Sequence, residues 1–104
     1  MFKTLKSILG FGPKVDFKEL IRQGAVIVDV RTNQEFNQGH IKKSINIPLD
    51  TIQNEFKKLN KNKPVITYCA SGIRSWFAKN KLKANGFTEV YNGGGLMSLN
   101  NKIN

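Results

Sequence analysis

The stretch Ala25-Val-Ile-Val-Asp-Val30 decides the fold class, because a near-continuous apolar run is typical of a strand buried on both faces of a sheet. Pro64-Val-Ile-Thr-Tyr68 repeats this character and runs directly into Cys69. Shorter strands are expected at residues 44–47 and 87–91. Helical segments of about ten residues separate these runs, which predicts an α/β fold with a central, mostly parallel sheet flanked by helices.

Polar residues stand where the helices between these strands should begin. Four of them are predicted N-caps: Asp16, Thr32, Asp50 and Ser75. The first two are each followed three residues later by a glutamate, which is the spacing of a capping box. The segment Gly93-Gly94-Gly95 predicts a turn that leads into a final short helix.

The chain length of 104 residues predicts a single domain. We assign residues 15–104 to this domain and residues 1–14 to an N-terminal extension. Four apolar residues of the extension share one helical face: Phe2, Leu5, Ile8 and Leu9. They predict either a short helix packed on the domain or a helix that docks on a membrane surface or a partner. A signal peptide is not expected, because Lys6 interrupts the apolar run and no small-residue cleavage pattern follows.

The net charge of +10 makes nucleic acid the first partner to consider. However, the basic residues comprise 14 Lys and only 3 Arg, and no aromatic residues interleave with them. Base recognition relies on arginine, and single-strand binding relies on aromatic stacking. We therefore expect no specific nucleic-acid binding, although the positive surface could steer small anions towards a site.

The chain has one cysteine, Cys69, and one histidine, His40. This composition excludes an intrachain disulfide and a Cys/His zinc site within one chain, so we expect no metal and no other cofactor. No stretch approaches the roughly 20 apolar residues that span a bilayer. Together these features predict a cytoplasmic protein, which we expect to be monomeric.

Reactive side chains follow two of the predicted strands. Asp29 and Arg31 stand at the end of one strand and Cys69 at the end of another, and parallel strands place both ends at the same edge, where α/β folds bind ligands. A loop over residues 70–75 would aim backbone N–H groups at the sulfur, and the helix that follows adds its positive dipole end. Gly72 permits a tight turn and Arg74 adds a positive charge. We predict a lowered pKa and a reactive thiolate at Cys69; the alternative is a buried cysteine that serves only packing.

The pattern Cys-x-x-Gly-x-Arg-Ser at residues 69–75 is accompanied upstream by four further motifs, in order. They are Val28-Asp29-Val30-Arg31, Glu35-Phe36, Gly39-His40-Ile41 and Asn46-Ile47-Pro48. This ordered set, over roughly residues 15 to 98, resembles the single-domain rhodanese (thiosulfate sulfurtransferase) family. The resemblance implies a rhodanese-like three-layer fold in which Cys69 takes a sulfane sulfur from thiosulfate or a persulfide donor. The Cys69 persulfide would then pass this sulfur to cyanide, a small thiol or a thiol protein.

The resemblance also assigns roles at the site. The loop residues are expected to bind the substrate: Ala70, Ser71, Gly72, Ile73, Arg74 and Ser75. Among them, Arg74 would hold the sulfonate oxygens of the donor and the backbone would hold the persulfide. Asp29 and Arg31 would support the rim, although an Arg31–Glu35 ion pair is an equally good interpretation of that arginine.

Other residues near these motifs have open roles. His40 is either a structural residue or a general base for Cys69, and we favour the structural role, because a thiolate already formed needs no base. Trp76 either packs over the entrance or covers surface. Lys43-Ser44 stands where the family usually has Gly-Ala.

The sequence is compatible with two other functions. Phosphatases and arsenate reductases use a similar loop with the spacing Cys-x5-Arg, whereas here the arginine comes five positions after the cysteine. The shorter loop suits a single sulfur atom better than a phosphoryl group. A carrier that holds sulfur or docks a partner without turnover is the other alternative, because Cys69 has no second cysteine with which to form a disulfide.

Overall fold

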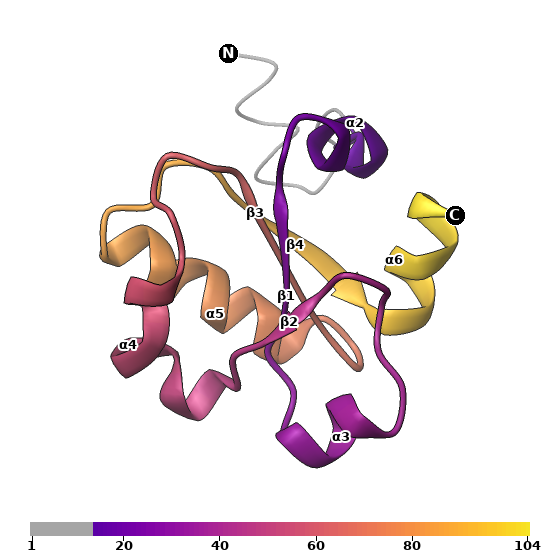
Figure 1. Ribbon diagram of the computed structural model, residues 1–104, viewed down its shortest axis with the longest axis horizontal. Helices are drawn as coiled ribbons and strands as arrows, with labels where there is room; N and C mark the ends of the chain where they lie inside the picture. The colour runs from indigo at the N-terminus through magenta and orange to yellow at the C-terminus, as the bar shows by residue number, and fades with distance from the viewer. Residues whose placement is uncertain (1–13) are drawn as a thin grey trace.

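The computed structural model describes residues 14–104 (Figure 1). The apolar face predicted at Phe2, Leu5, Ile8 and Leu9 lies outside these residues. No helix in the described part is long and apolar enough to cross a membrane.

A four-stranded sheet forms the centre of the fold. Its strands are β1 (Val26–Asp29), β2 (Ile45–Asn46), β3 (Val65–Cys69) and β4 (Val90–Gly95), in the order β2-β1-β3-β4. Every pair of neighbours is parallel. The predicted α/β class with a mostly parallel sheet is therefore confirmed, and all four strands end at the same edge.

Helices cover both faces of the sheet and give the expected three layers. On one face α4 (Ile52–Glu55) and α5 (Ile73–Ala84) pack over Val28 and Val65. On the other face α2 (Phe17–Arg22) and α6 (Leu96–Ile103) pack over Ile27 and Ile66. Figure 1 shows these two helix pairs on opposite sides of the strands. Neighbouring strand residues point to opposite faces, so a run that is apolar throughout can fill both cores.

Two of the predicted helix starts are confirmed. The Asp16 carboxylate accepts a hydrogen bond from the backbone N–H of Glu19 and begins α2. Thr32 and Glu35 form a complete capping box at the start of α3 (Asn33–Asn37). Both signals are local, since each cap and its partner are three residues apart, and local geometry alone decides them.

The predicted caps at Asp50 and Ser75 are wrong. Asp50 lies inside a 3₁₀ turn (Leu49–Thr51) that precedes α4, and a second 3₁₀ turn (Phe56–Lys58) follows that helix. None of these short segments has a side-chain cap. Pro48 presets the backbone angle for the first turn, so the chain coils before Asp50 could act as a cap.

The helix α5 begins three residues earlier than an N-cap at Ser75 would allow. Gly72 adopts a left-handed conformation (φ 101°) that a side chain would disfavour, and the helix starts directly after it. Ser75 therefore lies within the first turn and is fully buried. Its hydroxyl is thus directed towards the sheet and does not cap the helix.

The last strand is displaced from its predicted position at residues 87–91. It runs from Val90 to Gly95, so the three glycines predicted as a turn belong to β4, and α6 follows without a connecting loop. Phe87 is buried in the core but precedes the strand. A Cβ at Gly95 would lie 2.5 Å from the carbonyl oxygen of Ala70, so this strand end must lack side chains to pack against the loop after β3.

Candidate active site around Cys69

Cys69 ends β3, and Asp29 ends the neighbouring strand β1. The two strands are in register from Val26 opposite Val65 to Asp29 opposite Tyr68. The backbone N–H of Val30 extends this pairing by donating to the carbonyl of Tyr68 over 3.0 Å. The structure therefore brings the two predicted strand ends together at one edge.

Cys69 is only 1% exposed, and the loop that follows it contacts its sulfur. The backbone N–H of Gly72 donates to Sγ over 2.9 Å, and the Ser75 hydroxyl lies 3.5 Å from it. Burial raises the pKa of this thiol, but hydrogen bonds from the Ser75 hydroxyl and from three loop N–H groups outweigh it, so the pKa is lowered. Those N–H groups belong to Ser75, Gly72 and Ser71. The direction agrees with the predicted lowering of the pKa of Cys69.

Asn92 on β4 completes the surroundings of the thiol. Its side-chain carbonyl accepts from the Ser75 hydroxyl (2.6 Å) and from the N–H of Gly94 (2.9 Å). Its amide N–H donates to the carbonyl of Gly72 over 3.0 Å. The single proton of the Ser75 hydroxyl can turn to the thiolate, because Asn92 then still accepts from Gly94. Sequence reasoning missed Asn92, because a lone asparagine 20 residues beyond Gly72 carries no local signal.

Arg74 is paired with Glu35 on α3. Its guanidinium donates to both carboxylate oxygens of Glu35, over 2.7 and 3.0 Å. This pairing, helped by hydrogen bonds from Thr32, lowers the pKa of Glu35 to about 2. The geometry is the bidentate arrangement typical of arginine with a carboxylate. An ion pair across 39 residues therefore ties the start of α5 to α3.

The ion pair between Arg31 and Glu35, the alternative interpretation of Arg31, is not formed, because each has another partner. Arg31 donates to Asp29, with a shortest distance of 2.6 Å, and to the carbonyl of Gly39 over 2.7 Å. Both Asp29 and Arg31 are buried. The side-chain amide of Asn46 donates to the carbonyls of both residues. Asp29 and Arg31 thus form a buried ion pair whose hydrogen bonds are made within the protein.

His40 contacts Phe36, four residues earlier in the chain. Its Nδ1 donates to the carbonyl of Phe36 over 2.8 Å, and its ring stacks on the Phe36 ring with centroids 3.6 Å apart. The structural interpretation of His40 accounts for these contacts. Within residues 14–104, no three side chains of His, Cys, Asp or Glu come together as a set of metal ligands.

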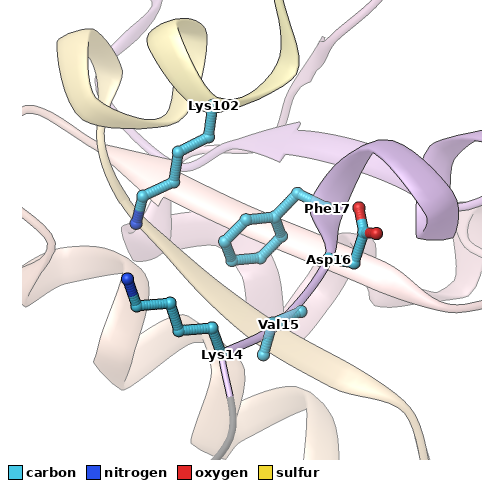
Figure 2. A pocket seen from close by; sticks show the side chains of 5 residues that line it. All are labelled: Lys14, Val15, Asp16, Phe17 and Lys102. Atoms are coloured by element: carbon cyan, nitrogen blue, oxygen red, sulfur yellow. The ribbon is translucent and has the colours of Figure 1, made fainter.

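A cavity of about 780 Å³ lies away from the thiol, where α2 begins beside α6 (Figure 2). Figure 2 shows the side chains of Lys14 and Lys102 bordering it, with the Phe17 ring at its wall. None of the residues that line it belongs to the Cys69 loop. The thiol therefore lies in its own backbone cradle and not in the large cavity.

The sequence model of the family described as Rhodanese-like domain matches residues 14–101 of this chain. The chain belongs to the rhodanese family. The uncharacterized protein YqhL of Bacillus subtilis (strain 168) is 40% identical over 80 residues, which cover 76% of this rhodanese and 64% of YqhL. YrkF of the same organism, whose name marks it as a candidate sulfur carrier protein, is 35% identical over 86 residues, covering 83% of this chain and 44% of YrkF. The chain thus spans less than two-thirds of either relative.

A solved structure described as a rhodanese with anions from E. coli superposes with a TM-score of 0.69 at 35% sequence identity. The match covers 72% of this rhodanese and 91% of that chain. The human single-domain sulfurtransferase TSTD1 superposes with a TM-score of 0.72 at 22% identity and bears on the fold alone. These likenesses confirm the rhodanese fold predicted from the ordered motifs.

The two departures noted at Lys43-Ser44 are accommodated in different ways. Lys43 adopts a left-handed conformation (φ 71°), which explains why glycine is usual there. The Ser44 hydroxyl donates to the carbonyl of Ile41 over 2.6 Å and lies 3.0 Å from the Tyr68 hydroxyl. Neither change reaches the Cys69 loop.

Proposed function

We propose that this rhodanese is a sulfurtransferase that carries a sulfane sulfur on Cys69. The observation that carries the proposal is the N–H of Gly72 directed at Sγ over 2.9 Å in a loop that lowers the pKa of the thiol. A thiolate is the nucleophile in sulfur chemistry, and the hydrogen bonds of this loop favour the thiolate over the thiol.

The proposed first step is attack by the Cys69 thiolate on the outer sulfur of thiosulfate. A sulfur–sulfur bond forms to Cys69, the sulfur–sulfur bond within thiosulfate breaks, and sulfite leaves with its electron pair. In the second step an acceptor thiolate or cyanide attacks the outer sulfur of the Cys69 persulfide, and Cys69 leaves as a thiolate. Charge and electrons balance in both steps, so neither oxidant nor cofactor is required.

The loop backbone would stabilise the persulfide as it does the thiolate. Both species carry one negative charge on sulfur, and fixed N–H dipoles in a buried site cost no reorganisation as the charge moves outward by one atom. We assign this role to the N–H groups of Ser71, Gly72 and Ser75 and to the path of the chain through Ala70 and Ile73.

The proposed role of Arg74 is to receive the sulfonate of the donor. Because Glu35 holds the guanidinium in the structure, an anionic donor would have to displace this carboxylate or share the arginine with it. A persulfide donor without a sulfonate would not need that exchange. Glu35 therefore sets how well thiosulfate competes with other donors.

A carrier role for the same persulfide is the second candidate, and the similarity to YrkF favours it. A carrier would load sulfur once and release it only to a dedicated partner. The 104 residues contain no second cysteine to resolve the persulfide, so either role requires an acceptor outside this sequence. We propose that residues 15–104 perform this chemistry as a monomer, in a reducing compartment such as the cytoplasm.

Steady-state formation of thiocyanate from thiosulfate and cyanide tests the enzymatic proposal. We expect turnover by the wild type and none by Cys69→Ser. Single-turnover loading without thiocyanate formation would instead support the carrier. Release of phosphate from an aryl phosphate that depends on Cys69 would contradict both and revive the phosphatase alternative.

A further inference from the structure

Helix α5 leaves three large apolar side chains in solvent at its start. Ile73 is 67% exposed, Trp76 49% and Phe77 50%. Their spacing places them on one helix face, opposite the buried Ser75, which packs towards the sheet with Ala78 and Leu82. Trp76 and Phe77 contact each other edge to face, with centroids 5.1 Å apart. Single exposed apolar residues are ordinary, but a cluster on one face marks an interaction site. We call these three residues the α5 patch.

The α5 patch lies at the mouth of the proposed active site. Ile73 directly follows Gly72, whose N–H contacts the Cys69 sulfur. On the other side of the loop, Gly95 lies against Ala70 and leads into α6, where Met97 is 74% exposed. Figure 1 shows that the turn after β3 lies between the starts of these two helices. Anything that binds to the patch is therefore held beside the loop that covers the thiol.

The charge around the patch restricts what can bind there. The helix carries Lys79, Lys81 and Lys83, and it has no acidic residue. The whole chain carries +10. A second copy would bring the same positive helix and be repelled, whereas a partner with carboxylates would be attracted and steered to this face.

We propose that the α5 patch docks an acidic thiol protein that presents apolar side chains beside its acceptor thiol. The proposal rests on the proposed function, since docking serves the second sulfur transfer. Cys69 is almost fully buried, so an acceptor thiol has to be guided into the loop. Trp76 and Phe77 are suitable anchors, because aromatic side chains at the centre of an interface contribute most of the binding energy.

The transfer that follows docking is balanced. The thiolate of the partner attacks the outer sulfur of the Cys69 persulfide and forms a new sulfur–sulfur bond. The bond between Cys69 and that sulfur breaks, and Cys69 leaves as a thiolate. The partner gains the persulfide without any oxidant or reductant.

Binding can be measured apart from sulfur chemistry, because Trp76 is the only tryptophan in the chain. The probe is a synthetic peptide of glutamate, leucine and phenylalanine with one central serine in place of the acceptor cysteine. We expect it to shift the Trp76 fluorescence and a peptide with lysine for every glutamate to have no effect. Phe77→Ser should weaken the binding about tenfold, as loss of an interface anchor does. Ile45→Ser on β2, where Ile45 is 40% exposed, is the matched control and should leave it unchanged.

The cysteine form of the same peptide tests transfer. From the wild-type persulfide we expect faster transfer to the glutamate peptide than to the lysine peptide, with a rate that falls as salt screens the charges. Phe77→Ser should slow this transfer about tenfold while leaving the rate with cyanide unchanged, because cyanide needs no docking. A persulfide that never forms, beside normal peptide binding, would refute the proposed function and leave the docking surface standing.

Four results would overturn the docking proposal. The first is equal binding of the glutamate and lysine peptides. The second is an equal loss of glutamate-peptide binding in Ile45→Ser and Phe77→Ser. Phosphatidylserine vesicles that shift Trp76 fluorescence when the peptide does not would assign the patch to a membrane. A dimer that disappears in Phe77→Ser would assign it to a second copy of this chain.

Discussion

Strands β1 and β3 are neighbours that end at the same edge, yet the polar groups at their ends are satisfied in opposite ways. At the end of β1, Asp29 and Arg31 neutralise each other, and Arg31 also donates to Gly39. At the end of β3, the Cys69 sulfur faces N–H groups and a hydroxyl, and no side-chain cation among residues 14–104 forms a hydrogen bond with it.

The polar groups at the end of β1 are paired with each other, whereas the sulfur at the end of β3 is the group that reacts in the proposed function. A buried ion pair that is complete has nothing left to bind, so it holds the edge in place. An anionic sulfur held by N–H dipoles can gain or lose an outer sulfur without breaking the structure that holds it. Two strand ends that look equally reactive in the sequence therefore differ: one holds a structural ion pair between Asp29 and Arg31, and the other carries the thiol of the proposed active site.

The largest effect is expected when the buried ion pair between Asp29 and Arg31 is broken. Asp29→Ala leaves the guanidinium of Arg31 buried without its partner, which should lower the free energy of unfolding by about 3–5 kcal/mol. Urea denaturation measures this loss. Replacing both residues, Asp29→Leu with Arg31→Met, should recover most of it, because no buried charge then remains. A cost below about 1 kcal/mol for the single variant would contradict the closed pair, since exposed pairs contribute that little.

A smaller effect is expected at the thiol. Ser75→Ala removes a hydrogen bond while burial remains, so the pKa of Cys69 should rise. A hydrogen bond to a charged group contributes about 1.5–3 kcal/mol, which predicts alkylation by iodoacetamide at neutral pH that is about tenfold slower or more. The pH profile of alkylation gives the direction of the pKa change. Ser44→Ala removes another buried hydroxyl, one that bonds with Tyr68, and should leave the profile unchanged.

The smallest effect on stability is expected at the pair between Glu35 and Arg74. The pKa of Glu35 is lowered from 4.5 to about 2, so its contribution to stability is present above pH 4.5 and is lost as the pH falls through 2. Both side chains are partly exposed, and Glu35→Gln should cost less than about 1 kcal/mol at neutral pH. The difference in unfolding free energy between the wild type and Glu35→Gln should shrink as the pH falls from 4.5 to 2 and vanish below pH 2. A difference that persists there would contradict the ion pair.

The same substitution tests the proposed competition for Arg74. Glu35→Gln leaves the guanidinium free of its carboxylate, so the KM for thiosulfate should fall while the rate with a persulfide donor stays the same. Arg74→Ala should raise the KM for thiosulfate in either background. A KM that does not respond to either change would show that Arg74 only joins α5 to α3.

Local patterns predicted the two central strands and the caps at Asp16 and Thr32, because buried runs and capping boxes are decided within a few residues. Long-range partners were missed or misassigned. Ser75 looks like a cap until Gly72 lets the helix begin earlier and Asn92 accepts from its hydroxyl. Arg74 and Glu35 are 39 residues apart, so the sequence offered the nearer Arg31 as a partner. The glycines of β4 resemble a turn because the close approach of Ala70 to Gly95 exists only in the folded sheet.

The intact mass of the reduced protein after exposure to thiosulfate tests the central claim most directly. We expect the wild type to gain the mass of one sulfur atom, which cyanide removes, and Cys69→Ser to gain nothing. An unchanged wild-type mass, or the same gain in Cys69→Ser, would contradict the assignment of Cys69 as the residue that carries sulfur from thiosulfate.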